Sequence, residues 1–273
     1  MTDWLEIRRG DGPLIISLPH TGTDIPAEIE ATLPSAWIAR KDADWWVDRL
    51  YAFARDMGAT TVRTRLSRTA IDVNRDPAGV SLYPGQTTTG LCPVETFDGE
   101  PLYGPGQAPD ETEIARRRAA YFAPYHTALT AEIARLRAIH PAIVVYDAHS
   151  IRSHVPRLFD GELPQFNIGT YDGASCAPAL TAAVEAACDA SPFSRVTNGR
   201  FRGGWITRHY GAPANGIHAI QMELACRGYM DEPADPASPD NWPPPFDDAR
   251  AAPLRAALER ILSACIAFAK DPA

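Results

Sequence analysis

Two histidines of this 273-residue chain follow short apolar runs that are typical of buried β-strands. His20 comes directly after LIISLP, and His149 comes directly after AIVVYDA. In an open α/β sheet, functional residues gather beyond the C-terminal ends of strands, so we expect these two side chains to meet. A lone histidine there is more often a hydrogen-bonded core or loop residue. A pair with acidic neighbours favours a site for zinc or a similar divalent metal.

A catalytic zinc usually has three protein ligands and one open position, and the third ligand is often a carboxylate. Our candidate is Asp44, which lies in KDADWWVD, 24 residues after His20. Asp42 and Asp48 are alternatives, and on a helix Asp44 and Asp48 share one face. Taken alone, Asp44 would be interpreted as a helix N-cap. The spacing therefore leaves the choice among these aspartates open.

Asp147 is a further alternative. It lies two residues before His149, so in an extended strand the two side chains point to the same side. From there Asp147 could be a ligand itself, or it could orient the histidine from behind.

Hydrolysis of an amide also needs a group that accepts a proton from water, and Glu223 is the candidate. It lies in the apolar segment HAIQMELACRG, which is predicted to be a strand. Burial of an unpaired carboxylate is costly and raises its pKa toward the range useful for a general base. Alternation along the segment allows a second interpretation, in which Glu223 lies on a solvated face.

The stretch from Ser67 to Arg75 offers Arg68, Asn74 and Arg75. Arginine binds carboxylates with two hydrogen bonds, and a nearby cation stabilises a developing oxyanion. Only Lys41 and Lys270 are lysines, so any single arginine is weak evidence. As a group, the arginines indicate an anionic substrate. Further candidates are Arg152, Arg157, Arg200, Arg202 and Arg208.

Composition excludes several classes of protein. The net charge of −8 and the lack of a basic stripe argue against nucleic-acid binding. No apolar run is long enough for a membrane span, and the first residues do not resemble a signal peptide. The five cysteines are widely spaced and form no CxxC, which indicates free thiols in a reducing compartment, the cytoplasm. GxGxxG, P-loop and GxSxG motifs are absent.

The pattern of strands and helices predicts one α/β domain over residues 1–273. Residues 76–110 lack a clear period and are predicted to be a long functional loop. Residues 233–247 are Pro-rich and predicted to be an extended connector. Strands are predicted at 14–18, 60–65, 70–73, 142–146 and 217–224, and helices at 36–57, 110–139, 175–190 and 249–269.

At these residues the sequence resembles the N-formylglutamate amidohydrolase family. The combination of DAHSIRS, PRLFDG and FNIGT with NGRFRGGWITRHYG is highly specific, whereas SLPHTG alone would be weak. The matching segments are SLPHTG (17–22), DADWWVDRLY (42–51), SRTAIDVNR (67–75), TTTGLCP and FDGEPLY (87–103), YDAHSIRSHVPRLFDGELPQFNIGT (146–170), NGRFRGGWITRHYG (198–211) and IQMELACRGYM (220–230).

The resemblance implies a mixed central β-sheet flanked by helices, related to zinc carboxypeptidases. It implies a metal, zinc or another divalent ion, held by His20, Asp44 and His149. The peptidases usually place the first histidine and its acidic partner in HxxE, but here Thr23 stands three residues after His20. The acid must therefore come from elsewhere in the chain.

The resemblance also implies an activity, the hydrolysis of N-formyl-L-glutamate to formate and glutamate in histidine degradation. It implies Glu223 as general base, Arg68 at the oxyanion, and a carboxylate clamp at Asn74 and Arg75. We expect Arg202 and Arg208 to help bind a small substrate with two carboxylates. A carboxypeptidase or a deacylase of another N-acyl acidic amino acid is the main alternative, and a non-enzymatic binding protein is a third.

Overall fold

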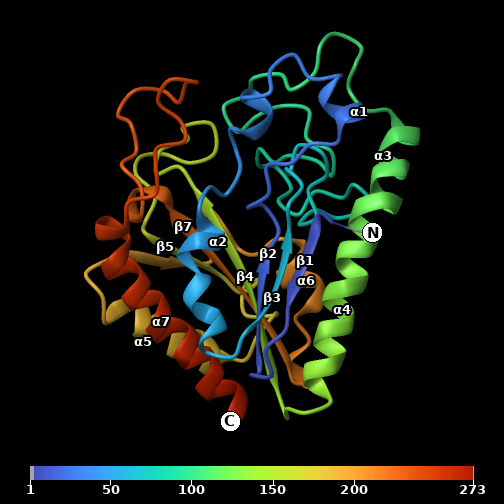
Figure 1. The fold of residues 1–273 in the computed structure, drawn as a ribbon. Coiled ribbons are helices and arrows are strands. Elements are labelled where there is room, and N and C mark those ends of the chain that lie inside the picture. Colours follow the sequence, from blue (N-terminus) through green and yellow to red (C-terminus); the bar gives the residue numbers. More distant parts are fainter. Residues whose placement is uncertain (1–2, 273) are drawn as a thin grey trace.

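Seven strands form one mixed sheet at the centre of the computed structural model, which describes residues 3–272 (Figure 1). Their order is β1-β3-β2-β4-β7-β5-β6; β1 pairs antiparallel with β3, β5 pairs antiparallel with β7, and the other neighbours are parallel. The mixed sheet predicted from the sequence is thus confirmed. The strands are β1 (Leu5–Arg8), β2 (Leu14–Leu18), β3 (Thr60–Thr64), β4 (Ile143–Ile151), β5 (Phe166–Gly169), β6 (Arg195–Thr197) and β7 (Ile217–Ala225).

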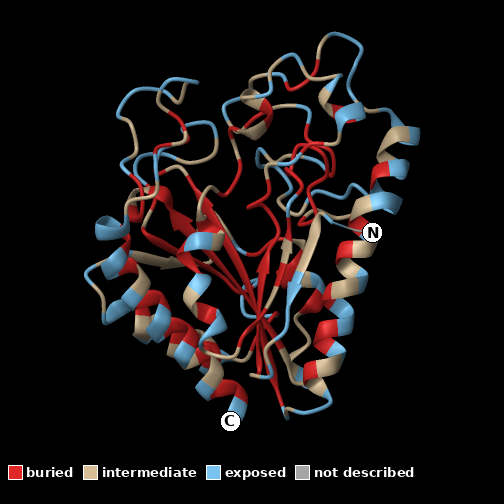
Figure 2. Ribbon diagram, viewed as in Figure 1, coloured by how far each residue is buried: buried red, intermediate tan, exposed pale blue. Residues whose placement is uncertain are grey.

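Helices cover both faces of the sheet, which gives a single α/β domain of three layers (Figure 1). One face packs against α2, α5 and α7, and the other packs against α4 and α6. Strand β4 is buried along its whole length, as expected of an apolar central strand (Figure 2). The helices are α1 (Ala27–Glu30), α2 (Val47–Leu50), α3 (Glu111–Arg117), α4 (Ala123–Arg137), α5 (Pro178–Asp189), α6 (Trp205–Tyr210) and α7 (Asp248–Lys270).

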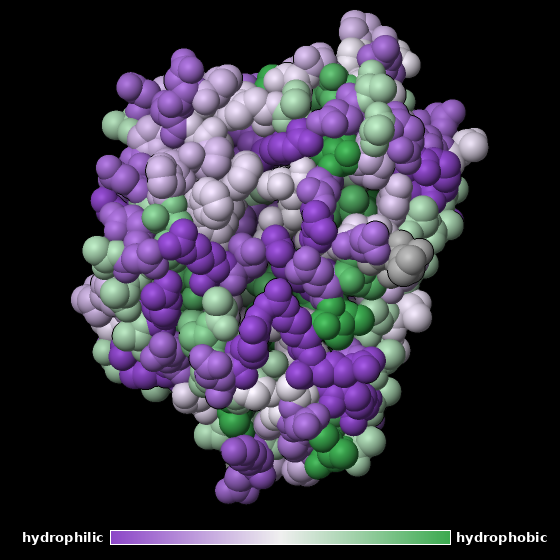
Figure 3. Space-filling model, in the orientation of Figure 1, coloured by the Kyte–Doolittle hydropathy of each residue, from purple (hydrophilic) through white to green (hydrophobic). Residues whose placement is uncertain are grey.

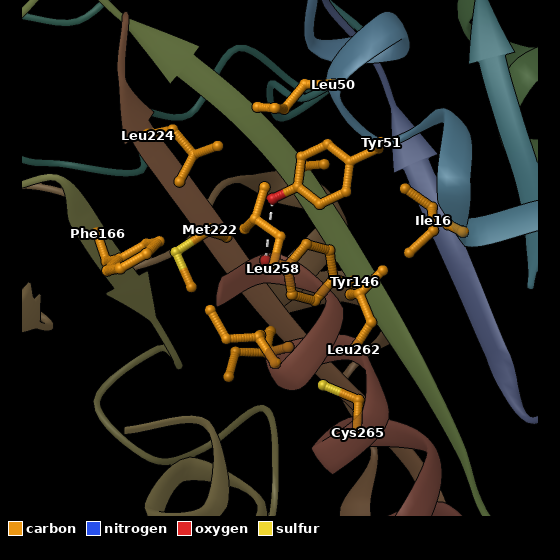
Figure 4. Close-up of a cluster of buried hydrophobic side chains, with 14 of the residues drawn as sticks. Ile16, Leu50, Tyr51, Tyr146, Phe166, Met222, Leu224, Leu258, Leu262 and Cys265 are labelled. Atoms are coloured by element: carbon orange, nitrogen blue, oxygen red, sulfur yellow. Dashed lines mark hydrogen bonds between the residues drawn. The ribbon is translucent and has the colours of Figure 1, made fainter. Parts of the chain in front are cut away.

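The core on the α7 side is built from alternate residues of the central strands. Tyr146 of β4 and Met222 of β7 pack with Leu258 and Leu262 of α7 (Figure 4). The Tyr146 hydroxyl is hydrogen-bonded to that of Tyr51 at 3.0 Å, so neither polar group is buried without a partner. The intervening residues of β4 and β7 face α4 and α6, and this second face leads to the polar residues of the site.

The prediction of one continuous helix over residues 36–57 is wrong. Trp46 has a left-handed backbone with φ 66°, and the Asp44 amide donates to the His20 carbonyl at 2.9 Å. This bond ties Asp44 to the loop after β2, which turns the chain toward the sheet edge instead of along a helix axis. The segment contains only short pieces, the 3₁₀ turns Ile38–Arg40 and Ala52–Arg55 and helix α2.

The predicted helix over 110–139 is confirmed with one irregularity. A π-helical turn, Arg118–Phe122, separates α3 from α4. Pro124 stands in the first turn of α4 and has no amide hydrogen for the preceding turn, which accounts for the break in the α-helical pattern.

Other predictions differ in detail from the structure. Residues 70–73 form no strand; they belong to a loop that enters the site. Residues 76–110 contain no helix or strand, as predicted, and neither do residues 233–247. Strand β4 continues to Ile151, so His149 lies within it and not beyond its end. The sequence pattern did not predict α1, α6, β1, β5 or β6.

The outer surface is mostly polar. On the face shown in Figure 3, hydrophobic residues form small patches separated by polar ones. Among residues 3–272, no helix combines the length and the apolar character needed to cross a membrane.

Candidate active site

The central strands bring the predicted residues to one edge of the sheet. His20 follows β2, and His149 and Glu223 lie near the ends of β4 and β7. His149 and Glu223 are direct partners across these two parallel strands, so their side chains leave the same face. The β-ladder itself therefore sets the distance between a candidate ligand and the candidate base.

His20, Asp44 and His149 form a buried group that could hold a metal ion, with potential ligand atoms all within 4.8 Å of one another. Asp44 Oδ2 lies 3.0 Å from His149 Nδ1 and 3.7 Å from His20 Nδ1. His20 Nδ1 is buried and has no hydrogen-bond partner in the described chain. Because a buried polar atom normally has a partner, this nitrogen fits the role of a metal ligand. Two imidazoles and one carboxylate suit zinc.

A buried carboxylate lies behind each imidazole. His20 Nε2 is 2.7 Å from Asp72 Oδ1, and His149 Nε2 is 3.0 Å from Asp147 Oδ2. With Nε2–H donated to these carboxylates, each Nδ1 could present its lone pair to a metal ion held beside Asp44. Carboxylates in this position fix the tautomer and orientation of ligating histidines.

The alternatives to Asp44 are engaged elsewhere. Asp42 accepts a hydrogen bond from the Phe97 amide at 2.7 Å. Asp48 is partly exposed and pairs with Arg63 at 3.0 Å. Asp147 lies on the Nε2 side of His149, where it accepts hydrogen bonds from Ser17 and Asn74. Of the four aspartates, Asp44 has the geometry of a ligand, and Asp147 has that of a group that orients one.

The charges of this group depend on one another. Burial opposes ionisation of Asp44, but the hydrogen bond to His149 and the neighbouring His20 ring outweigh it and lower its pKa. Burial likewise opposes a charged His149, but Asp147 and Asp44 raise its pKa well above its ordinary value. Both shifts show that the buried carboxylates favour positive charge at this position, as a cation site requires.

Glu223 is buried, so the interpretation that alternation places it in solvent is wrong. Gln221 and Glu223 of β7 point into the site, not out of the protein, and Gln221 Nε2 lies 3.4 Å from the Glu223 carboxylate. Burial raises the pKa of Glu223 to about 8. A carboxylate with a raised pKa in a polar cleft is suited to accept and return a proton.

Arg68 lies between the metal group and the pocket. Its Nη2 donates to Asp72 Oδ2 at 2.7 Å, and its Nη1 is 3.8 Å from Asp44 Oδ1. Asp72 thus contacts His20 with one oxygen and Arg68 with the other, and it fixes the two relative to each other. The ring of Phe97 covers the guanidinium at 4.8 Å.

Buried charges fix the loop that carries Phe97. Lys41 is only 4% exposed and pairs with Asp98 and Glu100. Arg152 pairs with the same Asp98 carboxylate at 2.8 Å. These contacts hold the loop against the end of β4, and with it the wall of the pocket above Arg68.

A pocket with about 700 Å³ of empty volume opens beside these residues. Residues of the long loop, Thr87, Thr88 and Thr89 among them, form part of its wall. Arg75 and Arg200 also line the pocket, in addition to Arg68 and Arg157. Arg75 is hydrogen-bonded to Thr89, and Arg200 is hydrogen-bonded to the carbonyls of Leu158 and Thr87. Burial lowers the pKa of both Arg75 and Arg200.

Arg202 and Arg208 were predicted to bind substrate, but neither is among the residues that line this pocket. Arg202 is exposed and pairs with Asp172 at 3.2 Å. Arg208 donates to the Gly203 carbonyl and lies between the rings of Tyr83 and Tyr171. The arginine that the structure brings to the pocket from this segment is Arg200.

Asn74 was also predicted to bind substrate, yet both polar atoms of its side chain are already engaged. Nδ2 donates to Asp147 Oδ2 at 2.8 Å, and Oδ1 accepts from the Ile206 amide at 2.7 Å. Asn74 borders the pocket but is only 2% exposed. This arrangement disagrees with the predicted clamp.

The sequence matches a known protein family over most of its length. The sequence model of the N-formylglutamate amidohydrolase family matches residues 12–230. The chain belongs to this family. It is 47% identical to the N-formylglutamate deformylase of Pseudomonas aeruginosa over 264 residues, 96% of this chain and 97% of that protein. It is 42% identical to the enzyme of the same name from Pseudomonas putida, over 98% of this chain and 97% of that protein.

A solved structure of an N-formylglutamate amidohydrolase from Ralstonia eutropha has the same fold. The two structures superpose with a TM-score of 0.79 at 23% sequence identity, over 98% of this chain and 99% of that one. The part of the chain that matches the amidohydrolase family model includes every site residue from His20 to Glu223. Helix α7 lies beyond it and contributes to the core instead.

Sequence reasoning missed Asp72, and it did not single out Arg200 as an arginine that lines the pocket. Asp72 stands in the segment SRTAIDVNR, but nothing in the local pattern shows that it faces His20, which is 52 residues earlier. One signal was present: an aspartate among apolar residues, in a segment that already held two arginines, is a candidate for a buried ion pair. For Arg200 we find no local signal that separates it from Arg202.

Proposed function

We propose that this protein hydrolyses N-formyl-L-glutamate to formate and L-glutamate, and that it requires a divalent metal, zinc, held by His20, Asp44 and His149. The observation that carries the substrate assignment is the 47% identity, over nearly the full length, to an N-formylglutamate deformylase. The unpartnered Nδ1 of His20 and its convergence with Asp44 and His149 support the metal.

A metal bound in this position supplies a Lewis acid beside the scissile amide. The remaining work falls to the side chains. Glu223 accepts a proton from the attacking water and passes it to the leaving amine of glutamate. Its raised pKa suits both transfers, because the group must take the proton up and also release it.

Arg68 is placed to hold the negative charge that develops on the formyl oxygen. Asp72 and the Phe97 ring fix its guanidinium before substrate enters, so little reorganisation is needed. The variant Arg68→Ala should therefore lower turnover more than it weakens substrate binding.

A formyl group offers few contacts, so affinity must come from the two carboxylates of glutamate. Arg75 and Arg200 line the pocket, and both are held by hydrogen bonds to neighbouring loops. Two fixed guanidinium groups provide charge-assisted hydrogen bonds to carboxylates. We assign these two arginines, in place of Arg202 and Arg208, to the substrate.

We further propose a cytoplasmic location and a role in histidine degradation. All five cysteines are free and buried, which supports a reducing compartment. The pathway assignment rests on the family to which the chain belongs. The substrate is a small dicarboxylate, and neither nucleic acid nor a membrane is proposed as a partner.

The test is formate release from N-formyl-L-glutamate, with N-acetyl-L-glutamate alongside, before and after chelation and after zinc is restored. Formate release that disappears with chelation and returns with zinc would support both parts of the proposal. Activity on the acetyl compound alone would keep the metal but overturn the substrate. Formate release that persists in metal-free protein would overturn the metal requirement.

A further inference from the structure

Asn74 contacts the two carboxylates that support the histidines of the metal group. Its side-chain Nδ2 donates to Asp147 Oδ2 at 2.8 Å, and its backbone amide donates to Asp72 Oδ1 at 2.9 Å. Asp147 and Asp72 are the two carboxylates that hold His149 and His20 from behind. One residue thus connects both carboxylate–histidine pairs.

The position of Asn74 is itself tightly fixed. Its Oδ1 accepts from the Ile206 amide, and its backbone carbonyl accepts from the Trp205 amide, both at the start of α6. A Cβ atom at Gly204 would lie about 2.5 Å from the Asn74 amide group, so a side chain there is excluded. Helix α6 therefore anchors Asn74 against β4.

We propose that Asn74 is a positioning residue for the metal site, which orients His149 through Asp147 and His20 through Asp72, and that it does not bind the substrate carboxylate. The inference rests on the metal site of the proposed function. It predicts that loss of the Asn74 amide misplaces two ligands at once. Groups that orient metal-binding histidines typically change metal affinity about 10–100-fold when they are removed.

Geometry suggests a test by exchange of the two side chains. Asn74 Nδ2 lies 2.9 Å from His149 Nε2, and Asp147 Oδ2 lies 3.0 Å from the same nitrogen. The double variant Asn74→Asp with Asp147→Asn therefore presents a carboxylate to His149 from position 74. It also restores the hydrogen bond between the side chains at positions 74 and 147, with position 147 now the donor and position 74 the acceptor. The side chain at position 147 still accepts a hydrogen bond from Ser17, because the amide oxygen of asparagine can take the place of Oδ1.

Zinc retention against a competing chelator is the main readout, with kcat and KM for N-formyl-L-glutamate beside it. We expect Asn74→Asp to lower zinc affinity about 10–100-fold, because it places two carboxylates in contact. The exchange variant should recover most of that loss. KM of the exchange variant should stay within about threefold of wild type, whereas Arg200→Ala, whose hydrogen bonds go to the carbonyls of Leu158 and Thr87, should raise KM and leave zinc affinity unchanged.

Three results would contradict the proposed role of Asn74. A carboxylate at position 74 would repel a substrate carboxylate, so a raised KM in both variants with normal zinc affinity would overturn the proposal. Failure of the exchange to improve on Asn74→Asp would also overturn it. If Asn74→Asp does not fold, Asn74→Ala gives a second test, and wild-type zinc affinity in that variant would count against us. Since zinc retention needs no substrate, this result is independent of whether wild type releases formate.

Discussion

The site has two halves that are built differently. The metal half, defined by His20, Asp44, His149 and Glu223, is carried by or tied to the central strands, and its members are all less than 10% exposed. The pocket half, which includes Arg75 and Arg200, is formed where the long loop over 76–110 meets other loops. Its arginines are partly exposed and are held mainly by backbone carbonyls.

The difference follows from what each half must do. Ligation and proton transfer depend on the distances between a few atoms. Paired strands fix such distances because the spacing between their residues is regular. Recognition of two carboxylates depends on charge and on several weaker contacts, which loops on a rigid scaffold supply. Changes in the metal half should therefore alter turnover or metal content, and changes in the pocket half should alter substrate affinity.

The largest effect should come from Glu223. We expect Glu223→Gln to lower kcat by about 10²–10⁴-fold, because glutamine cannot accept the proton of the attacking water. KM and zinc content should change little, as the amide fills the same space. Steady-state kinetics with metal analysis measures all three. A raised KM with normal kcat would indicate that Glu223 acts in substrate binding, which would contradict the division into a metal half and a pocket half.

Asp44 and Asp48 provide a matched pair in one segment. Asp44→Asn should weaken zinc binding at least about 100-fold, because it replaces a charged ligand at the point of convergence. Asp48→Asn removes only a surface ion pair with Arg63 and should leave zinc affinity unchanged. Chelator competition on both proteins is the measurement. Equal effects of the two substitutions would argue against Asp44 as a ligand.

In the pocket half, Arg75→Ala and Arg200→Ala should each raise KM about 10–100-fold, since a hydrogen bond to a charged group contributes about 1.5–3 kcal/mol. Arg202→Ala is the control, with an expected change below about twofold, because its guanidinium pairs with Asp172 away from the pocket. Kinetics on N-formyl-L-glutamate tests all three. A larger effect of Arg202 than of Arg200 would reverse our assignment.

The smallest effect concerns stability of the metal-free protein. Burial raises the pKa of Glu223 from an ordinary 4.5 to about 8, so folding favours the protonated form. Its stabilising contribution is complete below about pH 4.5 and is lost as pH rises toward 8. Glu223→Gln lacks this titration, so its stability relative to wild type should increase as pH rises through that window. Denaturant unfolding at several pH values checks it; a pH-independent difference would contradict the buried carboxylate.

The central residues of the metal half were predictable from sequence, but the residues that support them and most of the pocket half were not. His20, His149 and Glu223 stand beside or inside apolar runs, and local pattern alone places such runs in a sheet. Asp72 and Asn74 act through contacts with residues far away in the chain, which spacing does not encode. The helix predicted over 36–57 failed for the same reason, because a hydrogen bond from Asp44 to His20 overrides the local helical pattern.

The buried Lys41 has a practical consequence for handling this protein. Of its two lysines, Lys41 is ion-paired and almost fully buried, whereas Lys270 is exposed at the end of α7. Figure 1 shows that α7 ends at the end of the sheet where β4 begins, whereas His149 lies near the other end of that strand. Amine-reactive dyes or surfaces should therefore modify Lys270 in preference to Lys41. Immobilisation through that lysine would leave the pocket facing solution.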